Sequence, residues 1–193
     1  MDICVFGASS DRIDLHYFEA GFALGALMAK AGHRLIFGGG KEGLMGACAR
    51  GVLENGGEAL GIAPRFFDEP GILMKDTCPM LFTETMAERK KLMEDRADAF
   101  IALPGGIGTF EEFFEVLTLK QLGQHRKPMA LLNTGAYYEP FCALLRAAAE
   151  GRFMSERVLD LFSVCDTPEE ALRLVTGGAG EEQPPLDLTL YSR

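Results

Sequence analysis

A strand, a glycine turn and a helix follow one another in the middle of this chain, and this succession constrains the fold more than any other segment. The apolar residues 99–103 are typical of a buried parallel strand. The turn P-G-G-I-G-T follows at residues 104–109, and a helix is expected over residues 109–122. In a Rossmann-like fold, glycines at this point let the backbone approach an anion, and free N–H groups at the helix start bind phosphate. The segment therefore predicts a nucleotide site.

Strand-like and helix-like segments alternate along the rest of the chain. Strands are expected at residues 3–7, 34–37, 59–63, 80–82, 99–103, 128–132 and 162–165, with helices between them. Strands joined in this way form a parallel sheet with right-handed crossovers, and ligands bind beyond the carboxyl ends of the strands. The pattern predicts an α/β fold: a doubly wound, mostly parallel, Rossmann-like sheet in a single domain.

Two segments fall outside this alternation. Residues 65–78 follow no clear period and are bounded and interrupted by prolines, so a mobile loop is expected there. Residues 177–193 begin with G-G-A-G-E-E-Q-P-P, which predicts a flexible C-terminal tail. The chain is therefore expected to consist of one nucleotide-binding domain over residues 1–176, followed by this tail.

Composition and charge argue against several classes of function. The net charge of −9 disfavours a nucleic-acid-binding surface, because such surfaces cluster basic residues. The five cysteines are scattered without C-x-x-C spacing, and the three histidines are isolated. Reduced thiols in a cytoplasmic protein are therefore expected, without disulfides or a metal site. The first residues read directly as a strand, so neither a signal peptide nor a membrane span is expected.

Three turns rich in glycine or serine fall at the carboxyl ends of expected strands. They are G-A-S-S at residues 7–10, G-G-G at residues 38–40 and G-G-I-G-T at residues 105–109. Around one crevice, three such turns can contact the phosphate, ribose and base of a nucleotide separately. The candidate binding residues in these turns are Ser9, Gly39, Gly40, Gly105, Gly106, Ile107, Gly108 and Thr109.

The second turn also matches the dinucleotide fingerprint G-x-G-x-x-G, at residues 38–43. However, it follows the second strand rather than the first. The next strand ends at Pro64 rather than at an acidic residue that would hold a ribose diol. NAD binding is therefore disfavoured, and no cofactor is expected.

Glu112 lies one turn into the helix that follows the third glycine turn, and two interpretations compete for it. The pattern T-x-x-E at residues 109–112 is a helix capping box, which the chain also uses at residues 85–88 and 167–170. Alternatively, the carboxylate acts on whatever the bound phosphate carries. The preceding P-G-G turn favours the second interpretation.

Arg89 and Lys90 occupy the opening turns of a helix expected over residues 85–96. Cations at that end oppose the helix dipole, so ordinary helix electrostatics does not explain them. A bound phosphate would remove the conflict, and arginine binds phosphate or ribose oxygens in a bidentate manner. Lys91 is interpreted as a solvated surface residue.

Taken together, these motifs resemble the lonely-guy family of cytokinin-activating phosphoribohydrolases, within the wider lysine-decarboxylase-like group. The resemblance covers residues 3–175. It is carried by G-G-G and G-L-M-G at residues 38–46, by M-A-E-R-K at residues 86–90, and by P-G-G-I-G-T-F-E-E at residues 104–112. It implies hydrolysis of a nucleoside 5′-monophosphate to free base and ribose 5-phosphate, on a dimeric Rossmann-like fold without a cofactor.

The resemblance also implies roles for individual residues. Arg89 and Glu112 correspond to the catalytic pair, and Lys90, Gly106, Gly108, Thr109 and Thr118 to substrate contacts. Met86 and Glu111, which flank these positions, complete the expected site. The apolar helical stretches at residues 86–93 and 113–117 offer a surface for the implied homodimer. Adenine bases with or without an N6-prenyl group are expected, with residues 65–78 on the base side.

The expected chemistry agrees with these residue types. Cleavage of an N-glycosidic bond builds oxocarbenium character on the ribose, which a carboxylate such as Glu112 stabilises. Two alternatives remain open. A non-catalytic carrier of a phosphorylated ligand, like the molybdenum-cofactor carriers, would need the glycine turns but not the pair of Arg89 and Glu112. Lysine decarboxylation would need pyridoxal phosphate and a Schiff-base lysine, to which nothing in the sequence points.

Overall fold

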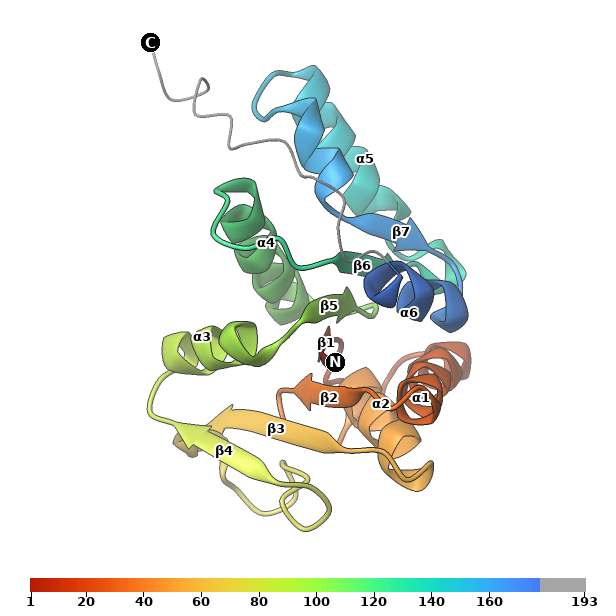
Figure 1. The fold of residues 1–193 in the computed structure, drawn as a ribbon, viewed down its shortest axis with the longest axis vertical. Helices are drawn as coiled ribbons and strands as arrows, with labels where there is room; N and C mark the ends of the chain where they lie inside the picture. Colours follow the sequence, from red (N-terminus) through yellow and green to blue (C-terminus); the bar gives the residue numbers. More distant parts are fainter. Residues whose placement is uncertain (178–193) are drawn as a thin grey trace.

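Seven parallel strands form one twisted sheet at the centre of the molecule (Figure 1). The computed structural model describes residues 1–177. The strands are β1 (Asp2–Phe6), β2 (Arg34–Phe37), β3 (Ala59–Pro64), β4 (Met80–Thr83), β5 (Ala99–Ala102), β6 (Met129–Leu132) and β7 (Ser163–Cys165). Their order in the sheet is β4-β3-β2-β1-β5-β6-β7, and all six pairings are parallel. The expected α/β, Rossmann-like fold is confirmed.

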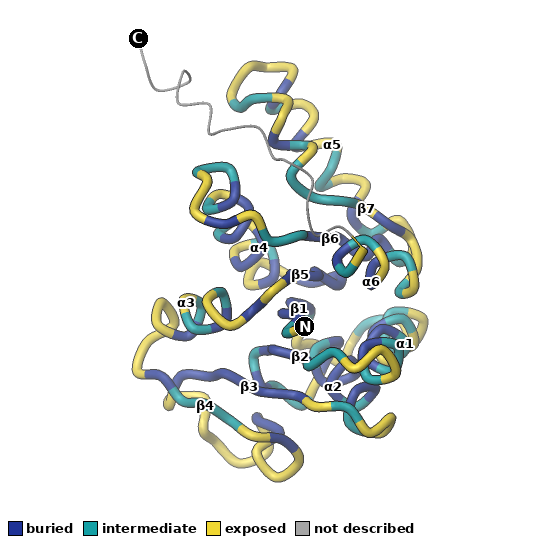
Figure 2. Tube along the Cα trace, viewed as in Figure 1, coloured by how far each residue is buried: buried dark blue, intermediate teal, exposed yellow. Residues whose placement is uncertain are grey.

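Helices cover both faces of this sheet. They are α1 (Leu15–Lys30), α2 (Gly43–Glu54), α3 (Met86–Arg96), α4 (Ile107–Gln121), α5 (Glu139–Glu150) and α6 (Pro168–Thr176), with short 3-10 turns η1 (Arg65–Phe67), η2 (Thr134–Ala136) and η3 (Glu156–Leu161). Side chains alternate across each strand, so Ile3 and Val5 pack with α1, α2 and α6. Cys4 and Phe6 pack with α3, α4 and α5 on the other face. The five inner strands are accordingly almost wholly buried, whereas the edge strands β4 and β7 are partly exposed (Figure 2).

The chain order of the strands reverses at β1, which lies between β2 and β5. In such a sheet, the crevice beyond the carboxyl ends at this point is where ligands bind. The three predicted turns follow β1, β2 and β5, so they lie at one edge. Hydrogen bonds join the first turn to the third turn and to the start of α2: the Ala8 N–H donates to the Pro104 carbonyl at 3.0 Å, and the Leu44 N–H donates to the Ala8 carbonyl at 2.8 Å.

Gly43 shows how closely the first turn approaches the start of α2. Its φ is +65°, and a Cβ there would lie 2.2 Å from the Ala8 carbonyl oxygen. Only glycine accommodates both the left-handed backbone and this contact. The Gly43 N–H donates to the Asp11 carboxylate at 2.8 Å, so the loop after β1 supplies the missing cap of α2.

The segment that was expected to be a mobile loop is anchored to the second glycine turn. Leu73 forms an isolated bridge with Gly40, and the Met74 N–H donates to the Gly39 carbonyl at 2.9 Å. Leu73, Met74 and Cys78 are buried. Apolar side chains therefore pack this loop against the domain although its sequence has no period.

Three further expectations can be compared with the structure. All five cysteines are free thiols. Within residues 1–177, no helix combines the length and the apolar character needed to cross a bilayer. The expected flexible tail lies, apart from Gly177, outside the described residues.

Candidate active site

A buried ion pair between Arg89 of α3 and Glu112 of α4 lies at the centre of the candidate site. Arg89 Nη1 donates to Glu112 Oε1 at 2.8 Å, and both side chains are 8% exposed. Arg89 Nε also donates to the Ile62 carbonyl of β3 at 3.2 Å. Two residues that are 23 positions apart, selected from separate motifs, are thus brought into direct contact.

Gly38 makes room for the arginine, and sequence reasoning did not include it among the site residues. A Cβ at this position would lie 2.3 Å from Arg89 Nη2. Any larger residue would displace the guanidinium from its place beside Glu112. The run of three glycines at residues 38–40 indicated that something approaches the backbone closely. It does not indicate which of the three glycines lies against the Arg89 side chain.

The environment of Glu112 shifts the pKa of its carboxyl upward. Burial raises the pKa of Glu112, and the adjacent Arg89 guanidinium opposes this rise only in part. A carboxylate in this setting is poorly solvated, which makes it a stronger electrostatic partner for a developing positive charge than one in water. Such a perturbed carboxylate in a crevice is typical of functional sites.

The capping-box interpretation of residues 109–112 is wrong, because α4 begins at Ile107 with Gly106 as its N-cap. Thr109 is therefore inside the helix, and its hydroxyl packs on Gly105, where a Cβ would lie 2.1 Å from Oγ1. Glu112 is bound by Arg89 instead of capping. At the other two patterns the threonine half of the box is present: the Glu88 and Glu170 N–H groups donate to the threonine hydroxyls at residues 85 and 167.

In the turn after β5, the carbonyls of residues 103–105 accept hydrogen bonds from the protein. The N–H groups of residues 105–109 find no acceptor in the described part of the chain. The Leu103 carbonyl accepts from the Tyr138 hydroxyl at 2.6 Å, the Pro104 carbonyl from the Ala8 N–H, and the Gly105 carbonyl from the Tyr137 hydroxyl. Five consecutive free donors at the start of a helix form a strong anion-binding element.

Space for an anion is available at this turn. A Cβ placed on Gly106 or on Gly108 would meet no atom within 4 Å. Both residues are exposed, as is Ile107, whose side chain is 86% exposed. Neither the fold nor the core therefore requires glycine at 106 or 108 for lack of room. Glycine at both positions leaves the backbone open to close approach from outside the domain.

Lys90 shows how the cations at the start of α3 are compensated. Lys90 Nζ pairs with Glu111 and, at 2.8 Å, with Glu115. Although partial burial lowers the pKa of Lys90, these two carboxylates raise it overall. The α4 carboxylates therefore offset the unfavourable helix dipole at α3, so this conflict does not by itself require a bound phosphate.

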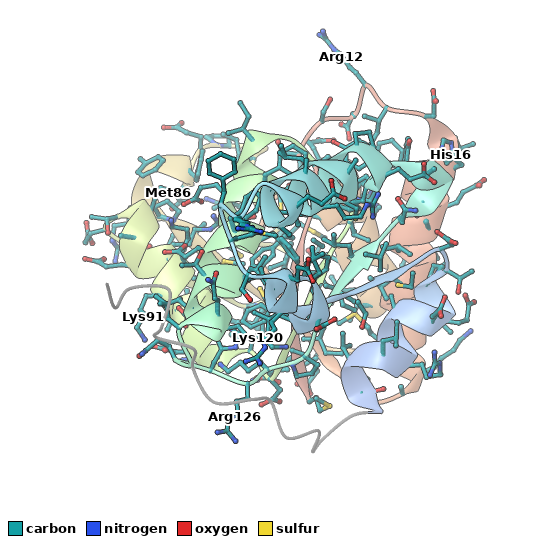
Figure 3. All side chains as sticks on the ribbon, turned by 90° about the horizontal axis from the view of Figure 1, so that it is seen from above. Arg12, His16, Met86, Lys91, Lys120 and Arg126 are labelled. Atoms are coloured by element: carbon teal, nitrogen blue, oxygen red, sulfur yellow. The ribbon has the colours of Figure 1, made fainter. Side chains whose placement is uncertain are left out.

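The remaining predicted site residues lie at different depths. Ser9 is exposed in the loop after β1, Gly39 is buried with φ +77°, and Gly40 is half-buried. Met86 is 37% exposed at the start of α3, where Figure 3 shows it on the same side as Lys91. Thr118 is exposed six residues beyond Glu112, about 9 Å along the helix axis, and does not join the pair within one chain.

The cavities found among the described residues cover at most part of this site. A cavity of 10 Å³, about the size of one water, lies beside Glu112 and Lys90. A groove of 570 Å³ lies between α2 and residues 73–77, and it contains neither Arg89 nor Glu112. We assign the site from the charge pair and the free N–H groups, because volume alone carries no chemistry. No set of three metal-ligating side chains occurs within residues 1–177.

Substitution of Arg89 should show how much the buried Glu112 carboxylate destabilises the fold when it has no partner. We expect Arg89→Ala to lower the free energy of unfolding by about 3 kcal/mol, because Glu112 then remains buried without its partner. The double variant Arg89→Ala/Glu112→Gln should recover much of this loss, since no charge remains to be buried. Urea unfolding followed by circular dichroism measures both.

Lys91→Ala provides the matched control for that measurement. Lys91 lies on the same helix and pairs with Asp95 at the surface, where its side chain is 65% exposed. Its loss should change stability by no more than about 0.5 kcal/mol. Equal effects of Arg89→Ala and Lys91→Ala would show that the Arg89 pair is energetically a surface pair.

Most of the chain, including the segments that form this site, is similar in sequence to known proteins. Residues 45–175 match the family model described as "Possible lysine decarboxylase". A cytokinin riboside 5′-monophosphate phosphoribohydrolase from Rhodococcoides fascians is 38% identical over 174 residues, which are 90% of this chain and 88% of that protein. A probable enzyme of the same name from Oryza sativa subsp. japonica is 40% identical over 89% of this chain and 77% of its own length.

Solved structures provide a more distant likeness. The molybdenum cofactor binding protein from Rippkaea orientalis superposes with a TM-score of 0.70 at 21% identity, over 91% of this chain and 95% of that one. The Moco carrier protein of Chlamydomonas reinhardtii gives a TM-score of 0.68 at 23% identity, with 91% and 95% covered. At these identities the likeness shows the fold alone. The family model and the phosphoribohydrolase relatives, in contrast, show that the chain belongs to the lonely-guy family, within the lysine-decarboxylase-like group.

Proposed function

We propose that this protein hydrolyses the N-glycosidic bond of adenosine 5′-monophosphates, with or without an N6 substituent, to the free base and ribose 5-phosphate. The observation that carries the proposal is the buried pair of Arg89 and Glu112 beside a turn whose N–H groups at residues 105–109 find no acceptor within residues 1–177. The relatives named as phosphoribohydrolases at 36–40% identity support it independently.

In this proposal the turn after β5 binds the 5′-phosphate. The N–H groups of residues 105–109 surround its oxygens, and the positive end of the α4 dipole adds to the attraction. The rest of the substrate is lined by Ser9 of the first turn and by Gly39 and Gly40 of the second turn. Met86 and Lys90 of α3, with Glu111 of α4, border the same crevice.

Glu112 would act on the sugar. As the bond from C1′ to the base nitrogen breaks, C1′ becomes positively charged, and the carboxylate stabilises that charge and orients the attacking water. The water oxygen joins C1′ and keeps one hydrogen, and the other proton of the water balances the proton that the departing base takes up. Arg89 holds Glu112 in place and presents its remaining N–H groups to ribose oxygens, so that C1′ faces the carboxylate.

Two other functions were considered against this one. A carrier of a phosphorylated ligand would use the turn, but it would gain nothing from a buried ion pair. Lysine decarboxylation would need an unprotonated lysine at the site to form a Schiff base. The lysine beside the pair, Lys90, is held protonated by Glu111 and Glu115, which raise its pKa. Both observations favour the hydrolase.

Glu112→Gln tests the proposal most directly. The amide keeps an oxygen for Arg89 and the volume of the side chain, but it removes the charge. Release of base from AMP should fall by about 10² to 10⁴-fold, while the affinity for AMP changes little. Chromatographic detection of adenine and calorimetric binding measure the two quantities.

Glu115→Gln is the control for this variant. Glu115 lies one turn further along α4 and pairs with Lys90 rather than with Arg89. It should retain most of the activity. Turnover near that of the wild type in Glu112→Gln would remove Glu112 from the mechanism.

Substrate selectivity should follow from the size of the turn. A monophosphate presents a compact dianion that the free N–H groups of one turn can enclose. Adenosine lacks these charge-assisted hydrogen bonds, and ADP and ATP present longer anions. We expect kcat/KM for AMP and isopentenyl-AMP to exceed that for adenosine, ADP and ATP by at least about 100-fold. Comparable rates on adenosine and AMP would refute the assignment of the phosphate site.

We propose that the protein acts as a homodimer in the cytoplasm. Phe113 and Leu117, expected on the dimer surface, are buried in the domain core instead. Exposed apolar side chains remain on the same two helices, at Met86, Ile107 and Phe114. A partner subunit at this face could also bring Thr118 to the site. Light scattering should give about twice 21.0 kDa, and a monomeric mass at working concentration would contradict the dimer.

A further inference from the structure

Two adjacent tyrosines bind the backbone of the turn after β5. Tyr137 and Tyr138 connect η2 to α5, more than 30 residues beyond that turn. The Tyr138 hydroxyl donates to the Leu103 carbonyl at 2.6 Å, and the Tyr137 hydroxyl donates to the Gly105 carbonyl. The two bonds flank Pro104, so both ends of the tight bend are held from the same side.

Tyr138 is itself fixed from behind by a chain of hydrogen bonds. Its N–H donates to Asn133 Oδ1 at 2.7 Å, and Asn133 Nδ2 donates to Asp166 Oδ1 at 3.1 Å. The Asn133 N–H donates to the Cys165 carbonyl at 2.7 Å. Because Tyr138 is only 1% exposed, its hydroxyl has few other positions to adopt. The ends of β6 and β7 therefore support the bond to Leu103.

Tyr137 is held by aromatic contacts instead. Its ring packs edge-on against Tyr17 of α1, with centroids 6.2 Å apart, and against Tyr138 at 5.2 Å. The ring is half-buried, so its hydroxyl can reach Gly105 without leaving the cluster. Packing alone would be served equally well by phenylalanine at both positions. The two hydroxyls need a separate explanation.

That explanation lies in the conformational freedom of the turn. Gly105 and Gly106 can adopt many backbone conformations, and only some of them direct successive N–H groups toward one point. A binding element that must be ordered by its ligand binds more weakly than one that is ordered beforehand. With the carbonyls of residues 103–105 all bound internally, the turn presents donors and no competing acceptors to the crevice.

We propose that Tyr137 and Tyr138 are positioning residues for phosphate recognition: their hydroxyls fix the turn so that the N–H groups of residues 105–109 converge on the 5′-phosphate. The inference rests on the proposed function and adds two residues to it. Neither tyrosine touches the substrate. Their effect should therefore appear in the affinity for the phosphate and not in the chemistry at C1′.

Tyr137→Phe and Tyr138→Phe test this by removal of one oxygen each. We expect each variant to bind AMP about 3- to 10-fold more weakly, with KM raised by a similar factor and kcat within about 2-fold of the wild type. The affinity for adenosine, which has no phosphate, should not change. Calorimetric titration with AMP, adenosine and ribose 5-phosphate measures the difference.

Tyr17→Phe is the matched control, because it makes the same chemical change in the same aromatic cluster. Within residues 1–177, the Tyr17 hydroxyl donates no hydrogen bond to the turn. This variant should bind AMP like the wild type. If the buried Tyr138→Phe variant fails to fold, the half-buried Tyr137→Phe variant alone decides the question.

The outcomes separate this inference from the proposed function. If the wild type neither binds nor cleaves AMP, the proposed function fails. If the wild type does both and the tyrosine variants bind AMP as Tyr17→Phe does, the positioning role is wrong. Equal losses for AMP and adenosine would also overturn it, because a general loosening of the domain would then explain the change. Selective loss of affinity for the phosphorylated ligands supports it.

Discussion

The ion pair between Arg89 and Glu112 is the interaction on which the arrangement of the site depends. It joins α3 to α4 across the face of the sheet, and the additional bond from Arg89 to the Ile62 carbonyl fixes the pair to β3. Two charges that are 8% exposed would be costly if either stood alone. Their mutual compensation allows both groups to lie in a poorly solvated crevice. Gly38, in the turn after β2, exists as glycine because the guanidinium needs its space.

The turn after β5 differs from this ion pair in how its hydrogen-bonding groups are satisfied. At the pair, donor and acceptor satisfy each other. At the turn, the three carbonyls of residues 103–105 are satisfied by the protein, and the N–H groups of residues 105–109 have no acceptor in the described part of the chain. The imbalance gives this edge of the sheet a local preference for anions, although the whole chain carries a net charge of −9.

Local pattern predicted the fold well because each element carries its own signal. Apolar runs located β1 to β7, and the glycine turns located the three loops that meet at one edge. The start of α4 was misplaced because Gly106 has no side chain to mark the cap, whereas T-x-x-E at residues 109–112 imitates one. Gly38 and the bonds from Tyr137 and Tyr138 were not found, because contacts over more than 30 residues have no periodic signature.

The separation of the turn from the ion pair explains how one fold can support different functions. The anion-binding turn follows from topology, since a parallel sheet delivers a helix start to the same crevice whatever the side chains are. The proposed hydrolysis uses two further side chains, at specific positions on α3 and α4. Proteins that share only the fold, including the molybdenum cofactor binding protein with a TM-score of 0.70, therefore say nothing about the reaction. What distinguishes this chain is that Arg89 and Glu112, which are 23 residues apart and come from separate motifs, form a buried contact beside that turn.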